Sequence, residues 1–357
     1  MNEINISRIE SNAIKGILII LVIIGHSSRL YDFPVSLRSF IYTFHYHCFF
    51  ILPFLYPIKP ISKNRIKKYI ARLLIPYLTL FFIAFSFLLL KAVREGDNNI
   101  PLLIANGLKT VILGGYYPLH NFFHIRYMWF LPAMFTLILI KDYFYSRAAQ
   151  YEKKLILFCG IIFYYFLWVC LKGPYCSEIR EEIMYLSPLS IWQAVGVCFL
   201  SWLTVNIISY IKKQKHFGSI KYLKVFIFVI FVVLFVLFIK TSQDSILLLP
   251  MKSILPIVAF LFLFSYRKTL SKINIFRKYG EHSFEIYIVQ TPISVVMYTM
   301  IPKYVNTESL YIRIFLFFLV IVICYYMALL VKKIPYINRV LFPRSWDEFM
   351  GRSVARS

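Results

Sequence analysis

The sequence predicts an all-α, polytopic integral membrane protein, a helical bundle of about ten transmembrane helices with both termini in the cytoplasm. Hydrophobic residues make up 60% of the 357 residues and charged residues only 16%, against ~45–50% and ~25% in soluble proteins. Long uncharged runs such as 225–239 and 314–331 are continuous rather than alternating. This pattern favours helices over an outer-membrane barrel.

Apolar runs between charged breaks define the predicted spans. In order, they cover 13–33, 37–57, 73–91, 126–141, 155–172, 188–211, 225–240, 246–266, 282–301 and 312–331. A further apolar piece, 100–113, is too short to cross a ~30 Å hydrocarbon core comfortably. We expect it to lie in the interface or to re-enter the outer leaflet.

The basic residues indicate the orientation of the spans. With the N-terminus placed in the cytoplasm, most of the 40 Lys and Arg residues fall on the cytoplasmic side, as the positive-inside rule requires. The formal net charge of +24 is therefore interpreted as an orientation signal rather than as a nucleic-acid footprint. We expect a transmembrane domain over 1–335 and a short basic cytoplasmic tail over 336–357.

The first span carries two ionisable residues on one helical face. Lys15 and His26 stand eleven positions apart, close to three turns at ~3.6 residues per turn. Lys15 would lie near the cytoplasmic surface and His26 roughly halfway across the membrane, where an ionisable group is costly without a partner or a cavity. His26 is thus a candidate general base, although a helix-end histidine bonded to a carbonyl is the structural alternative. Glu10 is placed to orient Lys15 or to balance its charge.

Two further histidines lie in the second span, beside the first. We expect His45 either to pair with His26 or to position a hydroxyl substrate. The alternative for His45 and His47 is an interfacial aromatic belt with tolerated histidines.

The first cytoplasmic loop is strongly basic. If it is helical, Arg65, Lys68 and Arg72 fall on one face, where three cations suit phosphate groups. Ordinary positive-inside charge explains the same residues equally well.

A further group of candidate functional residues stands where the apolar run near residue 126 begins. His120 and His124 have a spacing that binds zinc on a helix, but no third and fourth ligands stand out, and the six cysteines show no metal-type spacing. We therefore predict no metal site. His124 and Arg126 remain candidates for contacts with a substrate.

These residues together resemble the acyltransferase-3 family of integral membrane O-acyltransferases. The family pattern Arg/Lys-x10-His ending in Gly-His is matched by Lys15 and His26. Its other elements are matched in order by Phe44-His45, by Lys68, Arg72 and Ile75-Pro76-Tyr77, by Trp129–Pro132, and by Gly280, Ser283, Ile286 and Tyr287. The chain departs from the family at Pro53-Phe54, which replace a Ser-Gly pair. It also has Gln290 where many relatives carry histidine, so we assign no catalysis to Gln290.

The resemblance implies a membrane O-acetyltransferase of the bacterial cytoplasmic membrane. Acetyl-CoA, or another acyl-CoA, would be a co-substrate rather than a tightly bound cofactor. The acceptor would be a hydroxyl of a cell-surface glycan such as capsule, O-antigen or a lipid-linked sugar. The implied catalytic residues are His26, Lys15, His45 and Glu10; donor-binding residues are Lys15, Arg65, Lys68 and Arg72; substrate-binding residues are His124, Arg126, Trp129 and Tyr287.

Several alternatives stay open at this point. His26 is expected to remove the acceptor's proton directly, or to carry the acyl group as a transient acyl-histidine. A non-catalytic transporter or flippase for lipid-linked sugars explains the spans but not the Lys15–His26 pair. A polysaccharide polymerase would be expected to carry a larger arginine-rich outer loop.

Overall fold

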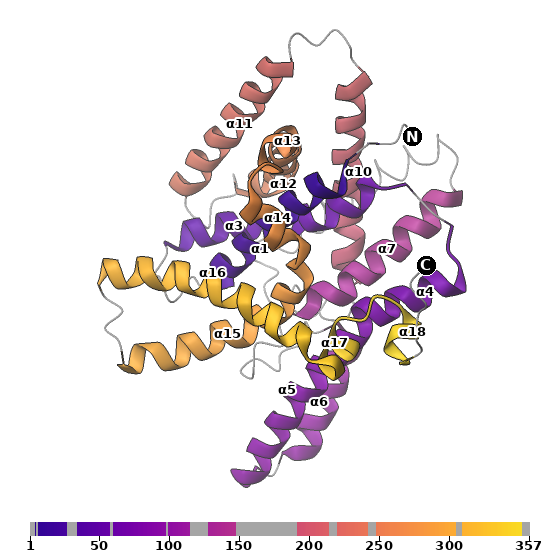
Figure 1. Cartoon of the computed structure of the whole chain (residues 1–357), viewed down its shortest axis with the longest axis vertical. Helices are drawn as coiled ribbons and strands as arrows, with labels where there is room; N and C mark the ends of the chain where they lie inside the picture. Colours follow the sequence, from indigo (N-terminus) through magenta and orange to yellow (C-terminus); the bar gives the residue numbers. More distant parts are fainter. Residues whose placement is uncertain are drawn as a thin grey trace. The chain divides into compact units, whose positions relative to one another are not determined.

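The computed structural model confirms the predicted all-α class. It describes residues 4, 6–26, 34–57, 60–97, 99–114, 128–147, 191–213, 220–241, 248–304 and 309–351, and within these ranges every regular element is a helix (Figure 1). Five of the described helices are long and apolar enough to cross a membrane. The predicted span 155–172 lies outside the described residues. The number of spans and the cytoplasmic placement of the termini stay predictions.

The described helices belong to two compact units, which are treated separately. Among the described residues, one unit contains those of Met1–Pro57 and Val197–Leu329, and the other contains those of 58–147, 191–196 and Leu330–Ser357. The first unit holds α1 (Arg8–His26), α3 (Val35–Ile51), η1 (Leu52–Leu55), most of α10 (Ile191–Lys213), α11 (Ile220–Lys240), α12 (Leu248–Ser265), α13 (Arg267–Leu270), α14 (Asn274–Glu281), α15 (Ser283–Tyr304) and most of α16 (Leu310–Lys333).

Helix α1 begins earlier than the apolar run predicted, because a capping box fixes its start. The backbone N–H of Ser7 donates to Glu10 Oε2 at 2.9 Å, and the N–H of Glu10 donates to Ser7 Oγ at 3.2 Å. This reciprocal pair satisfies two N–H groups at the start of the helix. The helix therefore includes Glu10, and it carries both Lys15 and His26 as one continuous element.

Helix α1 is the central helix of the first unit and packs against α3, α13, α14 and α15. Its closest neighbour is the short α14, which lies beside it in Figure 1. Two glycines allow this approach: a Cβ on Gly16 would overlap the carbonyl of Phe276, and a Cβ on Gly280 would overlap the carbonyl of Asn12. The two backbones therefore meet directly, which only glycine permits at such points.

Tyr279 fixes the other side of α14. Its hydroxyl donates to the carbonyl of Ile321 on α16 at 3.1 Å, and its ring stacks on Tyr325 at 4.8 Å between centroids. Burial raises the pKa of Tyr279 to about 12, so the hydroxyl keeps its proton and its role as a donor.

Aromatic side chains join α3 to α11. The ring of Phe40 lies 4.8 Å from that of Phe235 and 5.6 Å from that of Phe238. These offset and edge-to-face contacts add to the burial of apolar surface. The opposite face of α11 exposes apolar side chains, including Phe226, Val229 and Val233, as a helix facing lipid does.

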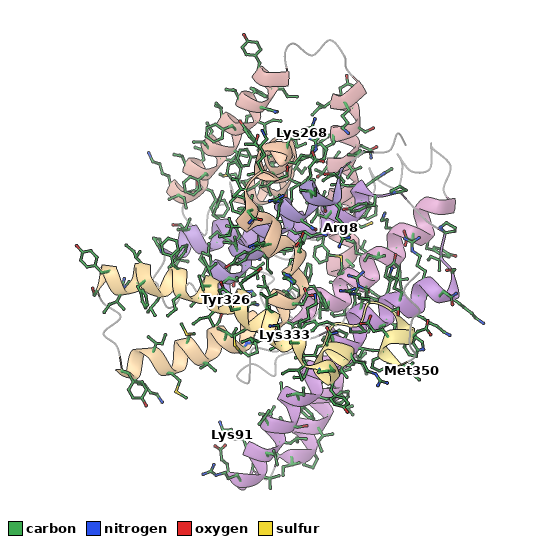
Figure 2. All side chains as sticks on the ribbon, in the orientation of Figure 1. Arg8, Lys91, Lys268, Tyr326, Lys333 and Met350 are labelled. Atoms are coloured by element: carbon green, nitrogen blue, oxygen red, sulfur yellow. The ribbon has the colours of Figure 1, made fainter. Side chains whose placement is uncertain are left out.

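The second unit holds α4 (Lys63–Tyr69), η2 (Ile70–Leu74), α5 (Ile75–Arg94), α6 (Ile100–Ile112), α7 (Phe130–Arg147), α17 (Pro335–Leu341) and α18 (Trp346–Phe349). α4, η2 and α5 follow one another without a break, and η2 is a π-helical turn. Lys91, which is labelled in Figure 2, lies in the last turn of α5.

The short apolar piece expected at 100–113 forms α6, which packs along α5. The hydroxyl of Tyr77 lies 3.2 Å from the carbonyls of both Thr110 and Val111. The ring of Phe85 occupies the space beside Gly107 that a Cβ would fill. The α5–α6 hairpin is therefore a packed element in its own right.

Candidate active site

His26 is the last residue of α1, and its imidazole contacts Gln290, a residue to which the sequence assigned no catalytic role. Its Nδ1 lies 2.9 Å from Oε1 of Gln290 on α15. Gln290 is fully buried, and its Nε2 donates to Oγ1 of Thr291 at 2.8 Å. A buried amide in an apolar helix needs such partners. The sequence signal for this contact was an amide within a predicted span, but that signal does not identify the partner.

Tyr42 on α3 lies between His26 and His45. Its ring centroid is 5.8 Å from that of His26 and 5.2 Å from that of His45. Gly25 helps to admit this ring, because a Cβ there would meet Tyr42 at 3.4 Å. Tyr42 therefore contacts both histidines, and the expected pairing of His26 with His45 stays a prediction.

Both histidines of the second span are oriented by their own helix. His45 Nδ1 donates to the carbonyl of Ile41 at 2.7 Å, and His47 Nδ1 donates to the carbonyl of Thr43 at 2.8 Å. Both side chains are buried. A proton on Nδ1 leaves the lone pair on Nε2 in each ring, and the ring of His45 lies beside that of Tyr42.

The N-terminal end of α1 lies in a small charged cluster. Glu10 Oε1 is 3.5 Å from Nε of Arg267, which donates from Nη1 to the carbonyl of Phe264 at 2.9 Å and lies 4.1 Å above the Phe264 ring. Lys212 approaches the same ring at 5.9 Å. Neighbouring Lys268 is labelled in Figure 2. Glu10 thus ties α1 to α13, and Lys15 lies further along α1, half-buried.

The predicted basic face of the first loop divides into two kinds of residue. Arg65 Nη2 forms an ion pair with Oδ2 of Asp142 at 2.7 Å, and Arg65 Nε donates to the hydroxyl of Tyr69 at 2.6 Å. The Asp142 side chain has no exposed surface. Lys68 and Arg72 are exposed, and the π-helical turn alters the α-helical spacing that the prediction assumed.

The expected substrate contacts are only partly described by the structure. His120, His124 and Arg126 lie outside the described residues. Trp129 is half-buried at the start of α7, and Tyr287 is buried on α15. The two described residues belong to different units, so each is placed only within its own. Among the described residues, no group of three His, Cys, Asp or Glu side chains has the arrangement of a metal site.

In the first unit, the imidazole of His26 lies at the end of a membrane-length helix and is oriented by the buried amide of Gln290. A second imidazole, that of His45, contacts the same Tyr42 ring as His26 does. Such a group suits proton transfer to or from a hydroxyl. Comparison with curated proteins and with solved structures gives no significant match. A family model described as an acyltransferase domain matches residues 8–329, which is nearly the whole chain and includes α1 and α15. The chain therefore belongs to the acyltransferase-3 family and is a membrane acyltransferase.

Proposed function

We propose that this protein is a membrane O-acetyltransferase that moves an acetyl group from cytoplasmic acetyl-CoA to a hydroxyl of a cell-surface glycan. The observation that carries the proposal is His26, which closes a membrane-length helix with its Nδ1 held by Gln290. Acyl transfer to a hydroxyl needs a base for the hydroxyl proton. Membership of an acyltransferase family supports the same class of reaction.

In the proposed reaction, Nε2 of His26 takes the proton of the acceptor hydroxyl. The hydroxyl oxygen then forms a bond with the carbonyl carbon of the thioester. The carbon–sulfur bond breaks, and the thiolate of CoA leaves with the bonding pair. The imidazolium of His26 returns the proton to this thiolate, so that free CoA and the acetyl ester are the products and His26 is regenerated.

The donor is a polyanion, and the exposed cations of α4 and η2 are suited to its phosphates. Lys68 and Arg72 are exposed, whereas Arg65 is engaged with Asp142 and Tyr69. We therefore assign phosphate contact to Lys68 and Arg72 and a supporting role to Arg65. Lys15 is proposed as a further cation for the donor, within the first unit and on the same helix as His26.

A transfer assay tests the proposal. Membranes that contain the protein are incubated with acetyl-labelled acetyl-CoA and the host's surface glycan, and label on the glycan is counted. We expect transfer by the wild type, and a loss of at least ~100-fold in His26→Ala, since a general base contributes ~10²–10⁴-fold.

The matched control is His47→Gln, which alters a buried histidine whose ring bond stays within its own helix. Its label transfer is expected to stay within about twofold of the wild type, because the Nδ1 bond of His47 to Thr43 lies within α3. Transfer that survives His26→Ala unchanged overturns the mechanism. Wild-type membranes that transfer no label, but move a lipid-linked sugar across the bilayer, overturn the function.

A further inference from the structure

We propose that Gln290 is a positioning residue that holds His26 in the tautomer with its hydrogen on Nδ1, so that Nε2 is the reacting nitrogen. This inference rests on the proposed function, because it assigns a role in the proton transfer by His26. The two residues come from different helices, α1 and α15, and their side chains meet at 2.9 Å. The contact is thus a tertiary one, in contrast to the bonds that orient His45 and His47.

Because Gln290 is buried, its amide needs hydrogen-bond partners within the protein. Its side chain has no exposed surface, and an amide without hydrogen-bond partners in such a place is strongly unfavourable. The pairing with His26 and Thr291 satisfies the amide oxygen and one amide hydrogen. A buried apolar residue of the same size would avoid this requirement, so the amide needs a reason beyond packing.

The two ends of the Gln290 amide have different partners. Gln290 Nε2 donates to Thr291 Oγ1 at 2.8 Å, and Oε1 faces the imidazole at 2.9 Å. An amide oxygen only accepts hydrogen bonds, so His26 Nδ1 must donate. The neutral imidazole then carries its lone pair on Nε2, the nitrogen that a general base needs.

A neutral partner has a different effect from a carboxylate. A carboxylate beside Nδ1 would stabilise the imidazolium by its charge, whereas an amide selects the tautomer without that charge. Gln290 therefore orients His26 without adding a charge beside its protonated form. This suits a base that must be neutral before each transfer.

Kinetics of two substitutions test the proposal. Gln290→Met keeps the length of the side chain and removes the amide. We expect kcat to fall by about 10- to 100-fold, a part of the ~10²–10⁴-fold effect of a general base, with the KM for acetyl-CoA within about twofold. In Gln290→Glu, we expect the acid limb of the kcat–pH profile to move to higher pH, because a carboxylate favours the imidazolium.

A double substitution separates positioning from general structural damage. If Gln290 acts through His26, then Gln290→Met causes no further loss in a His26→Ala background, because the two residues form one unit. The isosteric control Thr204→Val removes a buried polar group whose bond stays within α10. It is expected to leave kcat, KM and the pH profile unchanged.

The tautomer itself can be measured without any substrate. Side-chain ¹⁵N spectra of histidine-labelled protein in lipid nanodiscs distinguish a protonated Nδ1 from a protonated Nε2, and His26→Ala identifies the signal of His26. We expect a protonated Nδ1 in the wild type and a population with protonated Nε2 in Gln290→Met. Equal tautomer populations in both proteins overturn the inference.

The two proposals fail in different ways. If His26→Ala retains full transfer, the proposed mechanism fails, whatever the spectra show. If His26→Ala is inactive while Gln290→Met keeps the wild-type kcat and Gln290→Glu keeps the wild-type pH profile, only the positioning role of Gln290 fails. A Gln290→Met protein that does not fold leaves Gln290→Glu to decide, through its pH profile and its spectrum.

Discussion

Arg65 shows how a single ion pair changes the role of a residue. The sequence placed it with Lys68 and Arg72 in a phosphate-binding face, but its guanidinium is paired with the buried Asp142 and bonded to Tyr69. Removal of one member of a buried pair leaves the other charge uncompensated, which costs more than the pair itself contributes. Substitution of Arg65 is thus expected to lower the stability of the protein more than it weakens donor binding.

Arg65→Ala is predicted to lower the free energy of unfolding by about 3 kcal/mol, the lower end of the range for a broken buried pair. Thermal unfolding in detergent, compared with the wild type, measures this effect. The double variant Arg65→Gln with Asp142→Asn should recover most of the loss, because neither member of the pair is left as a charge without the other. A double variant as unstable as Arg65→Ala would contradict this account.

Lys68→Ala and Arg72→Ala are predicted to act on donor binding without loss of stability. Each should raise the KM for acetyl-CoA about two- to fivefold, since exposed ion pairs are weak and screened by salt. The KM for the glycan should not change, and the difference from wild type should shrink at high salt. An equal rise in both KM values would argue against phosphate contact. Lys15→Ala is expected to show the same preference for the donor.

At the scale of elements, α1 is held at several points along its length. The capping box fixes its first turn, Glu10 ties it to α13, the glycines join it to α14, and His26 meets Gln290 on α15. The backbone contact is the least tolerant of these, because a carbonyl group cannot move aside as a side-chain end can.

Gly16→Ala and Gly280→Ala are each predicted to destabilise the protein by more than ~2 kcal/mol, because each new methyl group overlaps a backbone carbonyl and forces the helices apart. Alanine otherwise favours a helix by ~0.5–1 kcal/mol over glycine. Gly25→Ala is the matched control, since the nearest atoms to its Cβ would be side-chain atoms, of Tyr42 at 3.4 Å and of Ile41 at 3.7 Å. Thermal unfolding should show large losses in the first two variants and little change in the control.

A part of these elements was predictable from the sequence. Long apolar runs identified α1, α5, α10, α11, α15 and α16, because burial in lipid demands continuous apolar length. The start of α1 was placed too late, since hydropathy does not detect the Ser7–Glu10 cap. The contact of α14 with α1 could not be read from Gly16 and Gly280, because glycine also serves turns and flexible links.

At the scale of the whole molecule, the sequence predicts which parts of the chain face the cytoplasm. The expectation that both termini are cytoplasmic rests on Lys and Arg and on the even number of predicted spans. The turn between α5 and α6, with exposed Asp97, should then face outward, and exposed Tyr336 on α17 should face the cytoplasm.

Cysteine labelling checks this orientation. Asp97→Cys should react with a membrane-impermeant maleimide in intact cells, and Tyr336→Cys should react only after the membrane is permeabilised. The described native cysteines, Cys48, Cys198 and Cys324, are buried, so the wild type provides the background. Labelling of Tyr336→Cys in intact cells would contradict the predicted topology.

The sequence identified His26 as the candidate base of the site, but it did not identify the residue that orients His26. His26 was identified because an imidazole deep in a membrane helix is costly without a function. Its partner Gln290 stands 264 positions away, and no local pattern joins two such distant residues. The family resemblance pointed away from Gln290, because many relatives carry histidine at this position.

The contacts of α1 also fix the register of α14 and α15. Asn12 meets Gly280 through the backbone, and His26 meets Gln290 through its side chain. Fourteen residues of α1 and ten residues from Gly280 to Gln290 therefore join the same two points of contact. One residue inserted or deleted between Gly280 and Gln290 would shift the amide by ~1.5 Å and ~100° around α15. Such a change would separate the amide from the imidazole of His26 although both helices could still form.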